Sequence, residues 1–153
     1  MTVTLRPVTK ADLGRLFDLK VAPEQRRFVA PNEITLAEAP FEQGSYVFAI
    51  WSDEAIVGLI ALIDMTEHDD VQPEDEPDSI FIWRLLIGAT HQGQGFGKAA
   101  IALACDWARA RGRPRMSIEV VSTNADAIRL YEKLGFAATG VMYGDEAQMA
   151  KSL

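Results

Sequence analysis

The residues with the clearest chemical meaning form one glycine-rich run, Gln92-Gly93-Gln94-Gly95-Phe96-Gly97-Lys98. The run lies between an apolar segment rich in β-forming residues, 79–87, and a segment with the apolar spacing of a helix. Glycines at the start of a helix leave backbone N–H groups accessible, and the helix dipole adds a potential that favours an anion. The run therefore predicts a phosphate-binding loop.

Two known phosphate-binding motifs, the P-loop and the dinucleotide fingerprint, are alternative interpretations of this run. A P-loop requires Ser or Thr after its Gly-Lys pair, whereas Ala99 follows Lys98, so no hydroxyl is available for magnesium. A dinucleotide fingerprint, G-x-G-x-x-A, is matched by Gly95, Gly97 and Ala100, but residues 88–92 separate it from its strand. Only one strand-helix-strand unit is expected, which also disfavours that fingerprint. A glycine-rich turn without a ligand is a further alternative, which the run of glycines at the start of the helix disfavours.

The segments around this loop predict a mixed sheet flanked by helices. Helices are expected from the Thr9/Asp12 cap to about residue 20, from Phe96 to Gly112 and from Asn124 to Gly135, whereas residues 21–43, with three prolines, predict short helical pieces. Strands are expected over residues 3–6, 46–51, 55–65, 79–87, 116–121, 136–143 and 148–153. A chain of 153 residues is of the size that one domain fills, so residues 1–153 are expected to form a single domain.

Two segments resemble the GNAT superfamily of N-acetyltransferases. Gln92, Gly95 and Gly97 match its acetyl-CoA signature, Gln/Arg-x-x-Gly-x-Gly/Ala, and residues 124–136, NADAIRLYEKLGF, are similar to its N-x-x-A-x-x-L-Y-x-K-x-G-F segment. The resemblance covers residues 79–136 and implies a mixed α/β fold: a mostly antiparallel sheet of six to seven strands, about four helices and one βαβ cofactor-binding unit. Residues 82–85 and 28–32 are similar to bacterial diamine and spermidine acetyltransferases.

The resemblance implies that acetyl-CoA is the acetyl donor and that different residues bind its pyrophosphate and its pantetheine arm. Backbone N–H groups of residues 92–98 would hold pyrophosphate, and the strand end at 85–87 would hold pantetheine. Asn124, which would bond the pantetheine arm, is equally suited to cap a helix. The cofactor-binding residues implied are Leu85, Leu86, Ile87, Gln92, Gly93, Gln94, Gly95, Phe96, Gly97, Lys98 and Asn124.

The resemblance also implies a general acid, a general base and an acceptor pocket. Tyr131 matches the family position that gives a proton to the departing thiolate, with core packing as its alternative. Glu119, on the strand beside the cofactor strand, is placed like the glutamate base of related alanine acetyltransferases, with a surface-facing carboxylate as its alternative. Trp83, Phe28 and Asn32 are expected to bind the substrate. Arg84 in the acceptor pocket would repel a cationic amine unless an acidic residue neutralises it.

Composition limits the partners of the chain. The net charge of −7 disfavours nucleic acid and anionic membrane surfaces and favours a cationic ligand. Eight acidic residues lie within 64–78 without Lys or Arg, and the ordinary interpretation is a solvated loop. Cys105 is the only cysteine, and no metal site is expected. The sequence shows no signal peptide or membrane span, so a cytoplasmic protein is expected.

The function that these observations predict is transfer of acetyl from acetyl-CoA to a primary amine, with a small diamine or polyamine as the preferred acceptor. Direct attack in a ternary complex is expected because no activated nucleophile is evident. Acetylation of protein N-termini or of aminoglycoside-like antibiotics, and a non-catalytic acyl-CoA sensor, remain alternatives. A homodimer is an open possibility.

Overall fold

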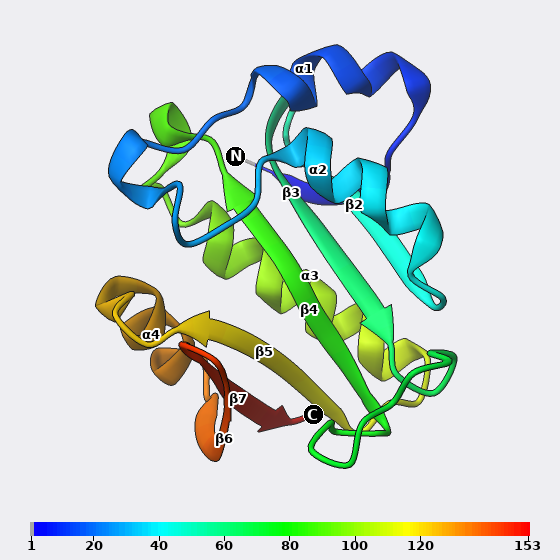
Figure 1. Cartoon of the computed structure of the whole chain (residues 1–153). Helices are drawn as coiled ribbons and strands as arrows, with labels where there is room; N and C mark the ends of the chain where they lie inside the picture. The colour runs from blue at the N-terminus through cyan, green and yellow to red at the C-terminus, as the bar shows by residue number, and fades with distance from the viewer. Residues whose placement is uncertain (1) are drawn as a thin grey trace.

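The computed structural model describes residues 2–153, which form one seven-stranded sheet flanked by helices (Figure 1). The strand order is β1-β2-β3-β4-β5-β7-β6, and every neighbouring pair is antiparallel except the parallel pair β4 and β5. The strands are β1 (Val3–Pro7), β2 (Ser45–Ser52), β3 (Ala55–Asp64), β4 (Ser79–Ile87), β5 (Arg115–Val121), β6 (Ala137–Tyr143) and β7 (Glu146–Ser152). The predicted mixed, mostly antiparallel fold is confirmed.

Four α-helices and four short 3-10 turns complete the described chain. The α-helices are α1 (Leu13–Asp18), α2 (Asn32–Glu38), α3 (Phe96–Ala110) and α4 (Ala125–Lys133), and the 3-10 turns are η1 (Lys10–Asp12), η2 (Pro23–Gln25), η3 (Ala39–Phe41) and η4 (Ala89–His91). The prolines of residues 21–43 produce the short pieces η2, α2 and η3, as predicted. No helix within residues 2–153 combines the length and apolar character that a membrane crossing requires.

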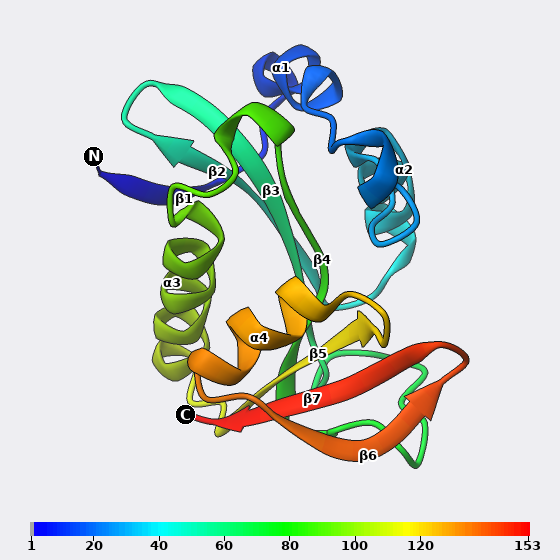
Figure 2. The same cartoon turned by 90° about the vertical axis from the view of Figure 1, so that its left-hand side faces the viewer.

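The helices cover opposite faces of the sheet (Figure 2). The larger core packs α3 and Tyr131 of α4 against one face, where Ile60 and Leu62 of β3 are fully buried. The smaller core packs Leu16 of α1 against the other face, beside Leu59 of β3. Successive strand residues point to opposite faces, so the almost continuous apolar run of β3 supplies both cores.

The sheet parts between its two parallel strands. β4 and β5 pair over only four residue pairs, from Ser79 with Arg115 to Ile82 with Ile118. Beyond that point β4 continues along β3, and β5 continues along β7. Trp83 is an extra residue in the β3–β4 register, because Ala61 pairs with Arg84 and Leu62 with Ile82. A bulge of this kind increases local twist, and it lies where the two strands separate.

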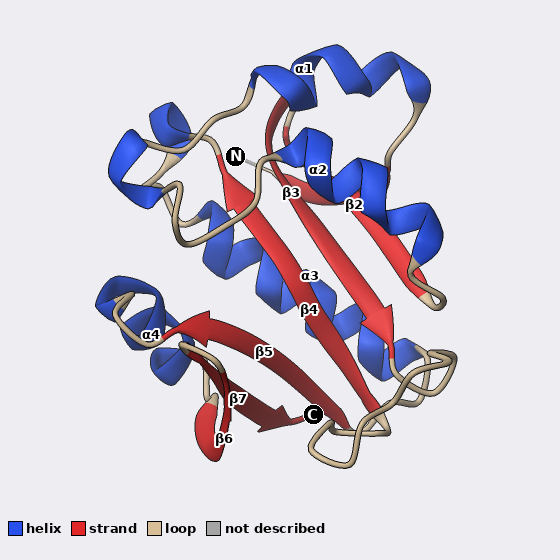
Figure 3. Cartoon of the chain, viewed as in Figure 1, coloured by secondary structure: helices blue, strands red, loops and turns tan. Residues whose placement is uncertain are grey.

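The acidic stretch 64–78, the long loop between β3 and β4 in Figure 3, is not merely solvated. Asp64 is fully buried, and its carboxylate accepts hydrogen bonds from Arg111 at 3.1 Å and from Arg113 at 3.0 Å. Glu67 pairs with Arg111, and Glu76 pairs with Arg115 at 3.0 Å. The expectation of a solvated loop is therefore wrong for these carboxylates. Their cationic partners lie 39 to 49 residues away in the sequence, so no local pattern revealed the ion pairs.

The Asp64 carboxylate is charged in the folded protein. Burial by itself would raise its pKa, but hydrogen bonds from Thr66, Arg113 and Arg111 outweigh burial and hold the pKa below its ordinary value. The carboxylate therefore fastens the start of the acidic loop to the end of α3.

We expect Asp64→Asn to lower the free energy of unfolding by about 3 kcal/mol at pH 7, because it leaves two guanidinium groups without their buried partner. Urea unfolding measures this change, with the exposed Asp69→Asn as the matched control. A depressed carboxylate pKa stabilises the fold above the unfolded-state value, and this contribution is lost as pH falls through the folded-state value. The difference between wild type and Asp64→Asn should therefore shrink in acid. Equal stabilities at pH 7 would show that the ion cluster does not stabilise the fold.

Candidate functional site

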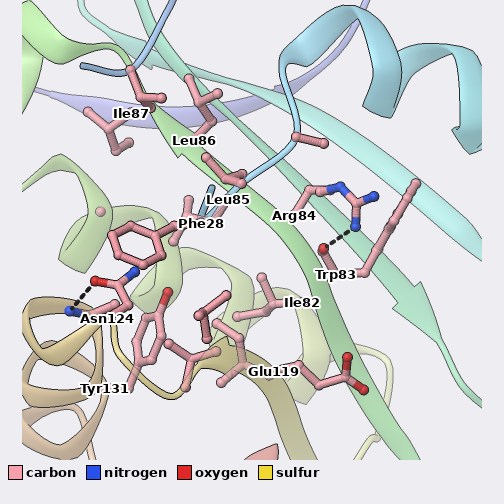
Figure 4. Close-up of a pocket in the computed structure, with 18 of the residues that line it drawn as sticks. Phe28, Ile82, Trp83, Arg84, Leu85, Leu86, Ile87, Glu119, Asn124 and Tyr131 are labelled. Atoms are coloured by element: carbon pink, nitrogen blue, oxygen red, sulfur yellow. Dashed lines mark hydrogen bonds between the residues drawn. The ribbon is translucent and has the colours of Figure 1, made fainter. Parts of the chain in front are cut away.

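A cavity of about 1280 Å³ opens where β4 and β5 part. Most of its lining comes from β4, the end of β5, the glycine loop before α3, helix α4 with its cap, the segment 21–30 and the loop carrying Asp75, and β7 adds Glu146. Figure 4 shows Phe28, Asn124 and Tyr131, from the segment 21–30 and from α4 with its cap, gathered beside the β4 side chains. Segments distant in sequence thus meet at the gap in the sheet.

The glycine loop forms one end of the cavity. Gly93 and Gly95 have positive φ angles of 77° and 86°, which side-chain-bearing residues rarely adopt. A Cβ on either would meet nothing within 4 Å, so backbone geometry, not crowding, requires glycine there. Gly95 caps α3, and the following Phe96, Gly97 and Lys98 also line the cavity. Gln94 is exposed and lies outside the cavity lining.

Gln92 uses its side chain within the protein. Its Nε2 donates to the carbonyl oxygen of Ile87 at 3.0 Å and to Oε1 of Gln25 at 3.1 Å, while its Oε1 accepts from Nε2 of Gln25 at 3.0 Å. The amide therefore orients the glycine loop against the end of β4. Only its backbone is left for a bound anion.

The end of β4 offers an unpaired strand edge along the cavity. Leu85, Leu86 and Ile87 line it and have no β5 partner, since the β4–β5 pairing ends at Ile82. Across the gap, Asn124 caps α4 by accepting from the N–H of Ala127 at 3.4 Å, a bond drawn in Figure 4. The cap confirms one of the two interpretations of Asn124, and the residue also lines the cavity.

Three carboxylates line the other end of the cavity. They belong to Glu119 of β5, Glu146 of β7 and Asp75 of the acidic loop. Burial, followed by the charge and the hydrogen bond of Glu146, raises the pKa of Glu119 to about 7. The Tyr143 hydroxyl donates to Asp75 at 3.0 Å and holds the loop carboxylate beside the strands. Within residues 2–153, none of the three carboxylates forms a salt bridge.

Tyr131 lies between the two ends of the cavity. Only 9% of the residue is exposed, its ring packs at 6.0 Å from that of Phe136, and burial raises its pKa to about 12. Its hydroxyl points into the cavity in Figure 4 and makes no hydrogen bond to another part of the described chain. The residue thus combines core packing with a free hydroxyl at the cavity.

Of the expected substrate residues, the structure brings Trp83 and Phe28 to the cavity but not Asn32. Asn32 is 1% exposed, and its Nδ2 donates to the carbonyl oxygen of Leu16 at 2.9 Å. It belongs to the packing of α2 against α1, which corrects the expectation. Arg84 also lines the cavity, stacks 4.9 Å from the Trp83 ring and pairs with Glu38 of α2 at 3.3 Å. That carboxylate partly neutralises the cation.

Sequence reasoning missed three residues at the site, Gln25, Asp75 and Glu146. Asp75 belongs to the acidic run that signalled only a loop, and Glu146 follows a tight turn at the start of β7. Neither residue belongs to a local motif. Glu146 comes near Glu119 only because β5 pairs with β7. Within residues 2–153, no group of three or more His, Cys, Asp or Glu side chains is arranged to hold a metal ion.

Comparisons with known proteins agree with this architecture. The spermine/spermidine N(1)-acetyltransferase of Bacillus subtilis is 24% identical over 155 residues, which span all of both chains. The structure of an aminoglycoside acetyltransferase, AAC(6')-Ib, in complex with coenzyme A has a TM-score of 0.81 at 21% identity and covers 99% of this chain and 95% of its own. Spermidine N-acetyltransferase from Vibrio cholerae, in complex with CoA and spermine, has a TM-score of 0.73 at 20% identity, with 98% and 95% coverage.

The sequence profile of the Acetyltransferase (GNAT) family matches residues 13–136, which include both signature segments and most of the cavity wall. The glycine loop, the parted strands and the capped helix α4 all fall inside the matched region. This protein therefore belongs to the acetyltransferase (GNAT) family.

Proposed function

We propose that this protein transfers acetyl from acetyl-CoA to a cationic primary amine, with a small diamine or polyamine as the acceptor. The observation that carries the proposal is one cavity with a glycine loop at one end and three carboxylates without salt-bridge partners at the other. A full-length relative named as a spermine/spermidine acetyltransferase supports the same acceptor class. The net charge of −7 adds a long-range attraction for a polycation.

The donor end of the cavity fits coenzyme A. A pyrophosphate would lie on backbone N–H groups of residues 93–98, where no Cβ at Gly93 or Gly95 obstructs approach and the N-terminus of α3 adds a favourable potential. The unpaired edge at Leu85–Ile87 offers backbone donors and acceptors to the amides of a pantetheine arm. Acetyl-CoA, when bound, supplies a thioester as the activated acyl group.

The acceptor end suits an ammonium group. Glu119 would take a proton from the ammonium so that the amine can react, and a carboxyl with a pKa of about 7 is well matched to that task near neutral pH. Asp75 and Glu146 would attract further positive charges of the same molecule. The pairing of Arg84 with Glu38 removes part of the conflict between that arginine and a cationic acceptor.

Tyr131 is suited to act as the general acid. Burial raises the pKa of its phenol to about 12, so the hydroxyl keeps its proton throughout the working pH range. As the amine nitrogen bonds the acetyl carbon and the carbon–sulfur bond breaks, this hydroxyl would give its proton to the departing thiolate and regain one from solvent. Its position in the cavity, and not its acidity, suits it to that step.

Thiol release from acetyl-CoA, measured across a panel of amines, tests the acceptor class. We expect spermidine, spermine and short diamines to give the highest kcat/KM, and Asp75→Asn to raise the KM for spermidine about fivefold by removing one attractive charge. The exposed Asp70→Asn is the charge-matched control. Good turnover of an aminoglycoside or a free peptide N-terminus with only background turnover of polyamines would refute the polyamine assignment.

Gly97→Val tests the binding of coenzyme A at the glycine loop. A Cβ at Gly97 would lie 3.9 Å from Ile87 and Leu130, an ordinary contact, so the variant should fold. Its branched side chain should nevertheless obstruct the cavity and abolish binding of coenzyme A, as calorimetry can show. Gly14→Val, at an exposed helical glycine with no neighbour within 4 Å, serves as its matched comparison.

The raised pKa of Glu119 predicts a pH dependence with opposite signs for rate and stability. The carboxylate is the active form of a base, so kcat/KM should rise with pH through about 7, and Glu119→Gln should lower it by about 10²-fold to 10⁴-fold. A raised carboxyl pKa makes the folded state lose stability as pH rises from the unfolded-state value through 7. Glu119→Gln should therefore raise the Tm at pH 8 more than at pH 5. The exposed Glu132→Gln is the control, and an unchanged rate profile would exclude Glu119 as the base.

Tyr131→Phe removes the hydroxyl and keeps the ring that packs on Phe136. We expect kcat to fall by about 10²-fold to 10⁴-fold when chemistry limits the rate, with the affinity for coenzyme A nearly unchanged. Tyr46→Phe, which removes a hydroxyl bonded to Glu67 outside the cavity, is the control. If both variants keep the wild-type kcat, Tyr131 serves only in packing.

A further inference from the structure

The segment 21–31 forms a wall of the cavity but is weakly attached to the rest of the protein. Residues Val21 and 24–30 line the cavity, and no side chain between Val21 and Pro31 is fully buried. Its backbone hydrogen bonds are local, such as those from Gln25 to Ala22 and from Phe28 to Gln25. In Figure 1 the segment lies beside the loop that leads into α3. Few buried contacts make such a segment one of low local stability.

One side chain links this segment to the glycine loop. Gln25 Nε2 donates to Gln92 Oε1 at 3.0 Å, and Gln25 Oε1 accepts from Gln92 Nε2 at 3.1 Å. Within residues 2–153 these are the only hydrogen bonds that join residues 21–31 to a part of the chain beyond α2. The same Oε1 also accepts from the N–H of Ala22 at 3.1 Å, so it fixes the turn η2 internally.

Gln92 stands at the junction of three cavity walls. Its Nε2 bonds both Gln25 and the carbonyl oxygen of Ile87, and it is the first residue of the glycine loop. A ligand that orders the backbone of residues 92–98 also restricts the Gln92 side chain. The Gln25 amide, as its reciprocal partner, transmits that restriction to the segment 21–31, which brings Phe28 to the cavity.

We propose that Gln25 is a positioning residue that couples occupancy of the glycine loop to ordering of the acceptor wall at residues 21–31. The inference rests on the proposed function, because coenzyme A is the ligand of the loop. Binding of the donor lowers the conformational entropy that the segment still has to lose when the acceptor binds. By reciprocity, an acceptor that orders the segment strengthens binding at the glycine loop by the same factor.

Hydrogen exchange of backbone amides, with and without coenzyme A, tests the coupling without knowledge of the acceptor. In wild type we expect coenzyme A to slow exchange both at residues 93–98 and at residues 24–30. Gln25→Met keeps the length of the side chain and removes its amide, so protection should remain at the glycine loop and be lost over 24–30. Gln72→Met, which removes an exposed amide bonded to Asp70, should behave as wild type.

Steady-state kinetics supply a second measurement with the acceptor found in the amine panel. Two solvent-accessible neutral hydrogen bonds contribute modestly, so Gln25→Met should raise the acceptor KM by about fivefold, with kcat changed little. The same substitution should have no further effect on acceptor KM in a Gln92→Met background. Gln25→Met removes the hydrogen bond from Ala22 in both the wild-type and the Gln92→Met background, but it removes the Gln25–Gln92 bonds only in the wild-type background. An effect seen only in the wild-type background therefore comes from loss of the Gln25–Gln92 bonds.

The outcomes separate this inference from the proposed function. If coenzyme A protects no residue of the glycine loop in wild type, the proposed donor site is wrong and the coupling fails with it. If the loop is protected while residues 24–30 are not, or if Gln25→Met retains protection there, the coupling alone is overturned. An additive effect of Gln25→Met in the Gln92→Met background would also overturn it.

Discussion

β4 and β5 hydrogen-bond over four residue pairs and then follow different neighbours, and the candidate site depends on this parting. A backbone edge left without a strand partner must find water or a ligand, since buried N–H and C=O groups are costly when unpaired. The bulge at Trp83 adds twist at the point of separation. The sheet thereby keeps two well-paired halves, β1–β4 and β5–β7, while leaving one gap between them that a ligand can enter.

Several contacts hold the two halves together around that gap. The Ser79 and Ser117 hydroxyls bond at 3.1 Å in the interior, where the strands are still paired. Asp64 at the end of β3 bonds Arg113, just before β5, so the acidic loop is anchored at its first residue. Gln148 of β7 donates to the Glu74 carbonyl at 3.2 Å near the far end of the loop. The acidic loop is thus a structural bridge that also delivers Asp75 to the cavity.

The two ends of the cavity have opposite electrostatic character because they are built differently. At the glycine loop the protein presents backbone dipoles and the start of α3, an arrangement that favours anions without placing a buried cation. At the other end it presents carboxylates, and burial together with their mutual repulsion raises the pKa of Glu119 to about 7. The two ends of one cavity therefore favour ligand groups of opposite charge.

Local patterns in the sequence were enough to predict the helices, the strands and the glycine loop. Apolar periodicity and the stops at Gly112 and Gly135 located strands and helices to within a few residues, and the two signature segments located the glycine loop and Tyr131, because these signals are local in the chain. Three features became visible only in the folded chain: Asp75 and Glu146 join Glu119, Asn32 is buried, and Gln25 bonds Gln92. The residues that meet at the cavity lie 27 to 67 positions apart in the sequence. Strand pairing and loop anchoring bring them together, and burial fixes Asn32. No local pattern in the sequence encodes these effects.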